Sequence, residues 1–346
     1  MFTSFGKNPS GEQLDSLLRS AQYSQGGFQN ISPTEMMIKK HSLISMTWKF
    51  LQKPLSTRPP GTIPSVRTDL KSFDQEQPVI IWFGHSSYLI HINSKNILVD
   101  PVFSGHASPF LFGAKSFEGS DVYSVADLPG IDLLLITHDH YDHLDHRTVK
   151  ELMPKVKKVC TSLGVGAHLQ YWGYDKQIIT EMDWGEQAVF FDTLQLKAAP
   201  ARHFSGRSLT RNKTLWASYI LEASDHKIYI GADSGYDSHF KKIGEDHGPF
   251  DLVLLETGQY HEDWPFIHMI PEEAVQAAID LQAKLLMPVH WGKFALAFHD
   301  WDEPVKRVIS AGASAGMKIG TPRIGEPLVL GDHIPDRHWW EAIAAS

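Results

Sequence analysis

The densest group of metal-ligand residue types occurs in residues 137–146, Thr-His-Asp-His-Tyr-Asp-His-Leu-Asp-His. Four of them fall within six positions: His138, His140, Asp142 and His143. Imidazole and carboxylate are the ligands that zinc takes where thiolates are absent. His138 and His140, two positions apart, can face the same way, while Asp142 and His143 come where the chain turns into a helix. The spacing therefore suits two adjacent metal ions better than one, and a solvated polar turn is the weaker interpretation.

Four further residues of the same types stand at or near the ends of apolar runs. They are Asp100 after NILV, His203 in PARHFSGR, Asp233 in IYIGAD and His290 after LLMPV. Each has an ordinary explanation when taken alone, because an aspartate can begin a turn and a histidine can be satisfied in a core. The ordered set, together with the His/Asp cluster, favours a metal site.

The pattern His-x-His-x-Asp-His after an apolar strand resembles the signature of the metallo-β-lactamase superfamily. The resemblance implies two divalent metal ions, with zinc expected and manganese or iron as the alternatives. The ligands that it implies are His138, His140 and His203 for one ion, Asp142, His143 and His290 for the other, and Asp233 bridging the two.

Longer segments narrow the resemblance: WFGHSSYLIHI, LVDPVFS, PARHFSGRS, IGADSGY, HMIPEEAV and HWGKFALAFH. From about residue 78 to 331 they are similar to the phospholipases D that hydrolyse N-acyl-phosphatidylethanolamine and to bacterial relatives of these enzymes. The resemblance implies hydrolysis of a phosphodiester in a glycerophospholipid by a hydroxide that bridges the metal ions.

Four residues receive supporting roles in that mechanism. Asp142 is expected to orient or deprotonate the attacking water, and His268 to donate a hydrogen bond or a proton to the phosphate. Asp100 is expected to orient a ligand histidine. His85, in the turn GHSS, either orients a ligand or packs as a structural histidine; His268 has the alternative of a surface residue at a helix entry.

Other functions remain open at this point. A lactonase resembling the ascorbate-phosphate lactonases would use the same ions on a carboxylic ester. A metal-bound scaffold without catalysis is disfavoured, because all seven expected ligands are present. A formal charge of -8 and the lack of a basic and aromatic cluster argue against a nucleic acid as partner.

The elements that must position these residues indicate an α/β (α+β) fold. Short apolar strands begin near Val79 as an antiparallel meander, and strands then alternate with helices, including residues 271–283 and 303–315. We expect a four-layer αββα sandwich of the metallo-β-lactamase type in residues 77–346, with residues 1–76 as an N-terminal arm.

Within the arm, residues 33–51 are expected to form a helix. Apolar side chains on one face and basic residues beside them suit peripheral contact with a membrane through residues 34–53, although docking on the domain is the more ordinary role. The chain begins without a signal-peptide pattern, contains no run long enough to span a bilayer and has a single cysteine, Cys160. A cytoplasmic location is therefore expected.

Overall fold

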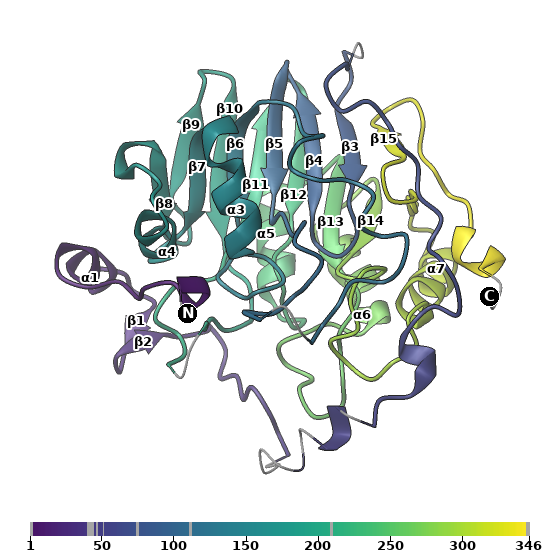
Figure 1. Cartoon of the computed structure of the whole chain (residues 1–346), viewed down its shortest axis with the longest axis horizontal. Helices are drawn as coiled ribbons and strands as arrows, with labels where there is room; N and C mark the ends of the chain where they lie inside the picture. The colour runs from purple at the N-terminus through teal and green to yellow at the C-terminus, as the bar shows by residue number, and fades with distance from the viewer. Residues whose placement is uncertain are drawn as a thin grey trace.

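Two β-sheets pack face to face at the centre of the molecule (Figure 1). The computed structural model describes residues 3–343 apart from 40–44, 46, 47, 51, 74, 75, 111, 112, 208 and 209. The first sheet has the strand order β15-β3-β4-β5-β6-β7-β8. Its strands are β3 (Val79–Trp82), β4 (Tyr88–Ile92), β5 (Lys95–Val99), β6 (Ile131–Ile136), β7 (Val156–Ser162), β8 (Ile179–Met182) and β15 (Pro327–Val329).

The second sheet contains the later part of the chain in the order β14-β13-β12-β11-β10-β9. Its strands are β9 (Gln187–Phe190), β10 (Leu194–Ala199), β11 (Ser218–Ala223), β12 (His226–Ile230), β13 (Leu252–Glu256) and β14 (Leu286–Val289). Strands β3 to β5 form the predicted antiparallel meander, and β5, β6, β7 and β8 run parallel to one another.

Helices cover the outer face of each sheet and complete four layers. Along β13, Leu252 and Leu254 face the core between the sheets, whereas Val253 and Leu255 face the outer helices. This alternation follows from the two-residue repeat of a strand. The first sheet is covered by α3 (His146–Leu152) and α4 (Gly166–Tyr171), and the second by α5 (His239–His247), α6 (Pro271–Asp280) and α7 (Glu303–Ala315). The predicted αββα sandwich is confirmed.

The bounds of two helices can be compared with those predicted from the sequence. Helix α7 has the predicted bounds and ends at Gly316, whose φ of 69° requires a residue without a β-carbon penalty. Helix α6 begins at Pro271, as predicted, but ends three residues before the predicted residue 283. Gln282 adopts a φ of 58°, which a continuing α-helix does not allow.

Strand direction brings the candidate residues to one edge of the sandwich. Strands β3, β5 and β6 run in one direction, and so do β10, β12, β13 and β14 in the second sheet. Backbone hydrogen bonds join the two sheets at this edge: His85 N–H donates to Trp291 O, and His290 N–H donates to His85 O. The carboxyl ends of these strands therefore surround one site, as is common in α/β sheets.

The arm packs against the domain through its own small elements. It contains α1 (Glu12–Leu17) and the hairpin of β1 (Tyr23–Ser24) and β2 (Gly27–Phe28). Leu17 and Phe28 are fully buried against Trp216. Figure 1 shows the arm continuing along the lower edge of the molecule, beneath the strands. The predicted boundary between residues 76 and 77 stays a prediction.

The predicted helix of residues 33–51 is wrong in its first part. Residues 33–39 contain no helix, whereas residues 45 and 48–50 are helical; residues 40–44, 46, 47 and 51 lie outside the described residues. Pro33 and Pro54 restrict the backbone on either side of this segment. No helix in the described part of the chain is both long and apolar enough to cross a membrane. Short 3-10 helices complete the list: Thr3–Phe5, Leu55–Thr57, Met153–Lys155, Lys176–Ile178 and Trp339–Ala342.

Candidate metal centre

The His/Asp cluster lies in the loop that joins the buried strand β6 to α3. Asp145 ends the loop as the helix cap, because its side chain accepts a hydrogen bond from Arg147 N. His138 and His143 are almost completely buried. A short loop fixed at both ends can therefore present several side chains to one cavity.

The first group of ligand atoms consists of three imidazoles. His138 Nε2 lies 3.0 Å from His140 Nδ1, which lies 3.2 Å from His203 Nε2. Burial lowers the pKa of His138 and of His203 well below the ordinary value, and burial lowers the pKa of His140 to about 4. Neutral imidazoles in this arrangement direct nitrogen lone pairs at one point, which suits a divalent cation.

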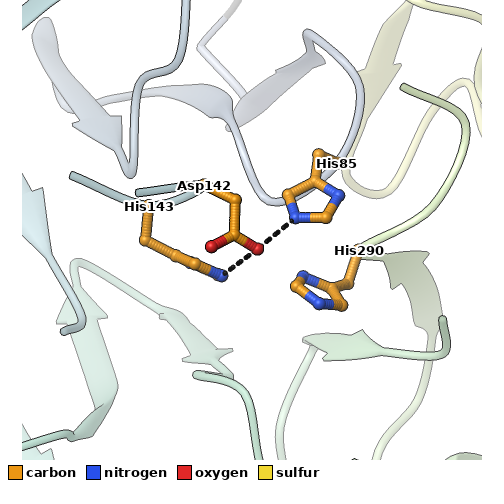
Figure 2. A group of neighbouring side chains, drawn as sticks. All are labelled: His85, Asp142, His143 and His290. Carbon is orange, nitrogen blue, oxygen red and sulfur yellow. Dashed lines mark hydrogen bonds and ion pairs between the residues drawn. The ribbon is translucent and has the colours of Figure 1, made fainter. Parts of the chain in front are cut away.

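The second group lies beside the first and contains one carboxylate and three imidazoles, shown in Figure 2. Asp142 Oδ2 lies 2.9 Å from His85 Nε2 and 3.5 Å from His143 Nε2. His290 completes this group, and its Nδ1 lies 3.0 Å from Ser86 Oγ. The sequence associated His85 only with orientation or packing, but the structure places it among the potential ligands.

Asp233 lies between the two groups. Its Oδ2 is 3.1 Å from His143 Nε2, 3.8 Å from His203 Nε2 and 3.9 Å from His138 Nε2. Its Oδ1 is 3.2 Å from His290 Nδ1. Burial raises the pKa of Asp233 to about 6. Burial also lowers the pKa of His143, but the carboxylates of Asp233 and Asp142 outweigh this and raise it well above the ordinary value.

Unsatisfied atoms test whether a metal ion fits this arrangement. Among the described residues, His290 Nε2 and Asp233 Oδ1 are buried without a hydrogen bond, although Oδ1 lies 3.2 Å from His290 Nδ1. Buried polar atoms are normally satisfied, and leaving one unsatisfied costs about 1–3 kcal/mol. A divalent cation accepts lone pairs from oxygen and nitrogen, so the donor set fits metal binding.

Asp100 lies behind the second group and contacts His143. Its Oδ2 lies 2.8 Å from His143 Nδ1 and accepts a hydrogen bond of 2.6 Å from Thr137 Oγ1, while its Oδ1 accepts one of 2.8 Å from Thr137 N. In this geometry Nε2 of His143 faces Asp233, and the orienting role of Asp100 stays a prediction.

Glu256, which the sequence analysis missed, contacts His268. Glu256 Oε2 lies 2.6 Å from His268 Nδ1, and Oε1 accepts hydrogen bonds from Ser234 N and Met269 N. Burial raises the pKa of the Glu256 carboxyl well above its usual value and lowers the pKa of His268. The signal was present, because Glu256 ends an apolar run just as Asp100 does.

A cavity of about 260 Å³ opens onto both groups. Met36, Met37 and Phe50 of the arm line it, together with Phe204, Arg211, Gln259, Trp264, Ile267 and Leu296 of the domain. A larger cavity of about 380 Å³ lies between β10 and α5 and contains none of the clustered ligand residues. Chemistry rather than volume therefore identifies the site.

Comparison with known proteins assigns the family. A family model described as a beta-lactamase superfamily domain matches residues 95–291. An uncharacterised protein of Mycobacterium tuberculosis is 40% identical over 328 residues, which cover 93% of this chain and 88% of that protein. N-acyl-phosphatidylethanolamine-hydrolyzing phospholipase D 1 of Caenorhabditis elegans is 31% identical over 256 residues, which cover 68% of this chain and 70% of that enzyme.

A solved structure supports the same fold. Igni18, described as a metallo hydrolase of Ignicoccus hospitalis, superposes with a TM-score of 0.57 at 20% identity. The match covers 73% of this chain and 97% of Igni18. The resemblance inferred from the sequence is confirmed by these relatives together with the matched family model. The chain belongs to the metallo-β-lactamase superfamily and is a metal-dependent hydrolase of that superfamily.

Proposed function

We propose that this protein hydrolyses the phosphodiester of a glycerophospholipid of the N-acyl-phosphatidylethanolamine type. The products are phosphatidic acid and an N-acylethanolamine. The observation that carries the proposal is the pair of adjoining His/Asp groups, with Asp233 between them, at the end of a largely apolar cavity. The similarity to the phospholipase D of Caenorhabditis elegans supports this choice of substrate class.

The proposed ligand set has two parts with one shared member. His138, His140 and His203 would hold one ion, Asp142, His143 and His290 would hold the other, and Asp233 would be shared between them. We expect zinc, with manganese or iron as alternatives. When bound, two divalent ions lower the pKa of a water molecule and offset charge that develops on phosphate oxygens.

The side chains supply orientation and proton transfer. Asp142, held by His85 at 2.9 Å, accepts a hydrogen bond from the attacking water and takes its proton. The oxygen of that water forms a bond to phosphorus, and the bond from phosphorus to the ethanolamine oxygen breaks. His268 gives a proton to the departing oxygen, so the alcohol leaves neutral.

The cavity wall supports an amphipathic anion as substrate. Phe204, Trp264 and Ile267 form an apolar surface beside the candidate ligands. Arg211 also lines the cavity: its guanidinium lies 5.5 Å from the centre of the Phe204 ring and 3.4 Å from Met36 Sδ. Within the described residues, it forms no ion pair with a carboxylate. A phosphate is the partner that this guanidinium matches.

We also propose that the arm brings the cavity to a membrane surface on the cytoplasmic side. Trp48 and Leu55 expose 61% and 94% of their surface, close in sequence to Phe50 in the cavity wall. Lys53 lies between them in sequence, with its ammonium 4.3 Å from the centre of the Phe50 ring and donating to Ala295 O at 2.8 Å. Apolar side chains with adjacent cations suit the interface of an anionic bilayer.

The test is hydrolysis of N-acyl-phosphatidylethanolamine in mixed micelles, with products resolved by mass. Metal-loaded protein should release phosphatidic acid and the N-acylethanolamine, whereas chelated protein and the Asp142→Asn variant should release neither. A lactone turned over faster than any phosphodiester would replace the proposal with a lactonase. Lack of turnover on every ester, with both ions bound, would leave a metal-bound scaffold.

Membrane contact needs a separate test with a matched variant. Full-length protein should float with vesicles of phosphatidylglycerol, and the double variant Trp48→Ser, Leu55→Ser should not, while both hydrolyse a water-soluble phosphodiester equally. The control is Val189→Ser, because Val189 is 64% exposed on β9, away from the cavity lining. Equal flotation of all three proteins would refute the arm's role.

A further inference from the structure

The contact between Glu256 and His268 is the feature of the site that the proposed mechanism leaves unexplained. Glu256 is the last residue of β13 and is 1% exposed. His268 comes from the loop before α6, and its Nδ1 lies 2.6 Å from Glu256 Oε2. A buried glutamate is costly unless it is fully engaged, so its partners indicate its role.

The carboxylate of Glu256 is fixed in orientation by three contacts. Ser234 N donates to Oε1 at 2.9 Å and Met269 N donates to Oε1 at 3.1 Å. The third contact is between Oε2 and Nδ1 of His268. Backbone donors from two different loops hold the group, so it cannot rotate without breaking hydrogen bonds. Glu256 is therefore a rigid support rather than a group free to reach into the cavity.

His268 consequently has only one nitrogen that can reach a substrate. Its side chain is 12% exposed and lines the cavity, and its ring centre lies 5.1 Å from that of His203 and 5.3 Å from that of His290. Because Nδ1 is engaged with Glu256 inside the protein, Nε2 is the nitrogen available to the cavity. The ring stands beside both groups of candidate ligands.

We infer that Glu256 is a positioning residue that holds His268 with Nε2 toward the departing oxygen of the substrate and shares a proton with Nδ1. This inference rests on the proposed phosphodiesterase function and extends it. As the bond from phosphorus to oxygen breaks, the oxygen takes the electron pair and the proton of Nε2. As Nε2 releases its proton, the proton shared between Glu256 and Nδ1 ends on Nδ1, so the ring ends neutral and Glu256 ends as a carboxylate.

The inference predicts that Glu256 matters only when the leaving oxygen needs a proton. In Glu256→Gln, the side-chain oxygen still accepts from the two backbone N–H groups. Its amide nitrogen must instead donate to Nδ1, so His268 retains its proton on Nε2 and cannot release it. General acid catalysis contributes roughly 10²–10⁴-fold where it acts, which sets the expected loss.

The experiment compares two phosphodiesters with the full-length, metal-loaded protein. On N-acyl-phosphatidylethanolamine, Glu256→Gln should lower kcat by about 100-fold and leave KM within about 3-fold. On bis(4-nitrophenyl) phosphate, whose leaving group needs no proton, kcat should stay within about 3-fold. His268→Gln should show the same contrast, and the double variant should lose no more than the single variants.

Two controls separate this role from a structural or metal-binding one. Glu181→Gln replaces a half-buried glutamate that likewise accepts a backbone hydrogen bond, from Gly166 N, and it should leave kcat unchanged on both substrates. Metal content measured by mass spectrometry should be the same for Glu256→Gln and the parent protein. Loss of an ion in that variant would make Glu256 a ligand and overturn the inference.

The outcomes also separate this inference from the proposed function. Equal loss of kcat on both phosphodiesters would overturn the role of Glu256 while leaving the phosphodiesterase proposal intact. If the parent protein hydrolyses only carboxylic esters, the phosphodiesterase proposal fails. In that case, kcat of Glu256→Gln would be compared on an alkyl ester and a 4-nitrophenyl ester. A loss on the alkyl ester alone would support the role of Glu256, and an equal loss on both esters would refute it.

Discussion

Replacing Asp100 with asparagine tests whether orientation of His143 controls metal binding. Asp100 accepts a hydrogen bond from Thr137 N at Oδ1 and another from Thr137 Oγ1 at Oδ2; the single oxygen of asparagine can keep the first, whereas its amide nitrogen takes the place of Oδ2 beside Oγ1. Its amide nitrogen then faces Nδ1 of His143, which lies 2.8 Å from the present carboxylate oxygen. His143 can accept this hydrogen bond only by moving its own proton to Nε2, the nitrogen 3.1 Å from Asp233. An imidazole nitrogen that carries a proton cannot bind an ion.

The structure gives the size of the expected effect. One charge-assisted hydrogen bond is lost, worth about 1.5–3 kcal/mol. At about 1.4 kcal/mol per factor of ten, metal affinity should fall by about 10- to 100-fold, the range usual for residues that orient ligands. Asp100 has a φ of 40°, a conformation that asparagine tolerates, so backbone strain should contribute little. In the metal-free protein, His143 can accept the new hydrogen bond at Nδ1, so the unfolding free energy should fall by less than about 1.5 kcal/mol.

The assay is competition for zinc with a chromophoric chelator, together with urea unfolding of the metal-free protein. Asp132→Asn provides the matched control, because Asp132 is a buried aspartate of β6 that contacts Asn96 N and Lys157 rather than the site. Its metal affinity should equal that of the parent protein. Unchanged zinc affinity in Asp100→Asn would refute the reasoning, as would a large loss of stability without metal, because Asp100 would then serve mainly the fold.

Three further results are expected. In initial-rate assays, Arg211→Gln should raise KM for the anionic phospholipid by about 10-fold and leave kcat within about 3-fold. An equal rise of KM for an uncharged ester would contradict the proposed role of Arg211 in binding phosphate. Burial lowers the pKa of His239 from 6.5 to about 4, so the unfolded state binds more protons than the folded state between these pH values. The unfolding free energy should therefore fall by about 3 kcal/mol as the pH drops from 6.5 toward 4. Urea unfolding of His239→Gln should lack this pH-dependent loss. Burial raises the pKa of the Cys160 thiol far above its usual value, so native protein should not react with a thiol reagent that modifies the urea-unfolded chain.

Much of the site could be predicted because its members mark the ends of strands. Asp100, His138 and His290 each follow an apolar run, and parallel strands place their carboxyl ends at one edge. His85 could not be placed in the same way. It occupies a turn with a φ of 54°. Backbone hydrogen bonds bring it beside His290, and they join segments of the two sheets that are far apart in sequence.

The arm could be predicted less well than the sandwich. A pattern of apolar residues indicates a helix but not where it begins, and residues 33–39 extend along the domain instead. Ile38 N donates to Asp263 O, and the ammonium groups of Lys39 and Lys49 lie 3.3 Å and 3.1 Å from the Asp263 carboxylate. These contacts with a residue distant in sequence compete with local helix formation, and no local pattern reveals them.

The site contains two carboxylate–histidine pairs that make the same contact but place the free nitrogen of the histidine differently. Each uses a carboxylate at or just past the end of a strand, Asp100 after β5 and Glu256 on β13, to hold Nδ1 of a histidine. In the first sheet this turns Nε2 of His143 inward to Asp233, where an ion would bind. In the second sheet it leaves Nε2 of His268 for the cavity that the residue lines. Under the proposed function, the same kind of buried pair would orient a metal ligand on one side of Asp233 and a proton donor on the other, because Asp100 holds His143 and Glu256 holds His268 by the same nitrogen.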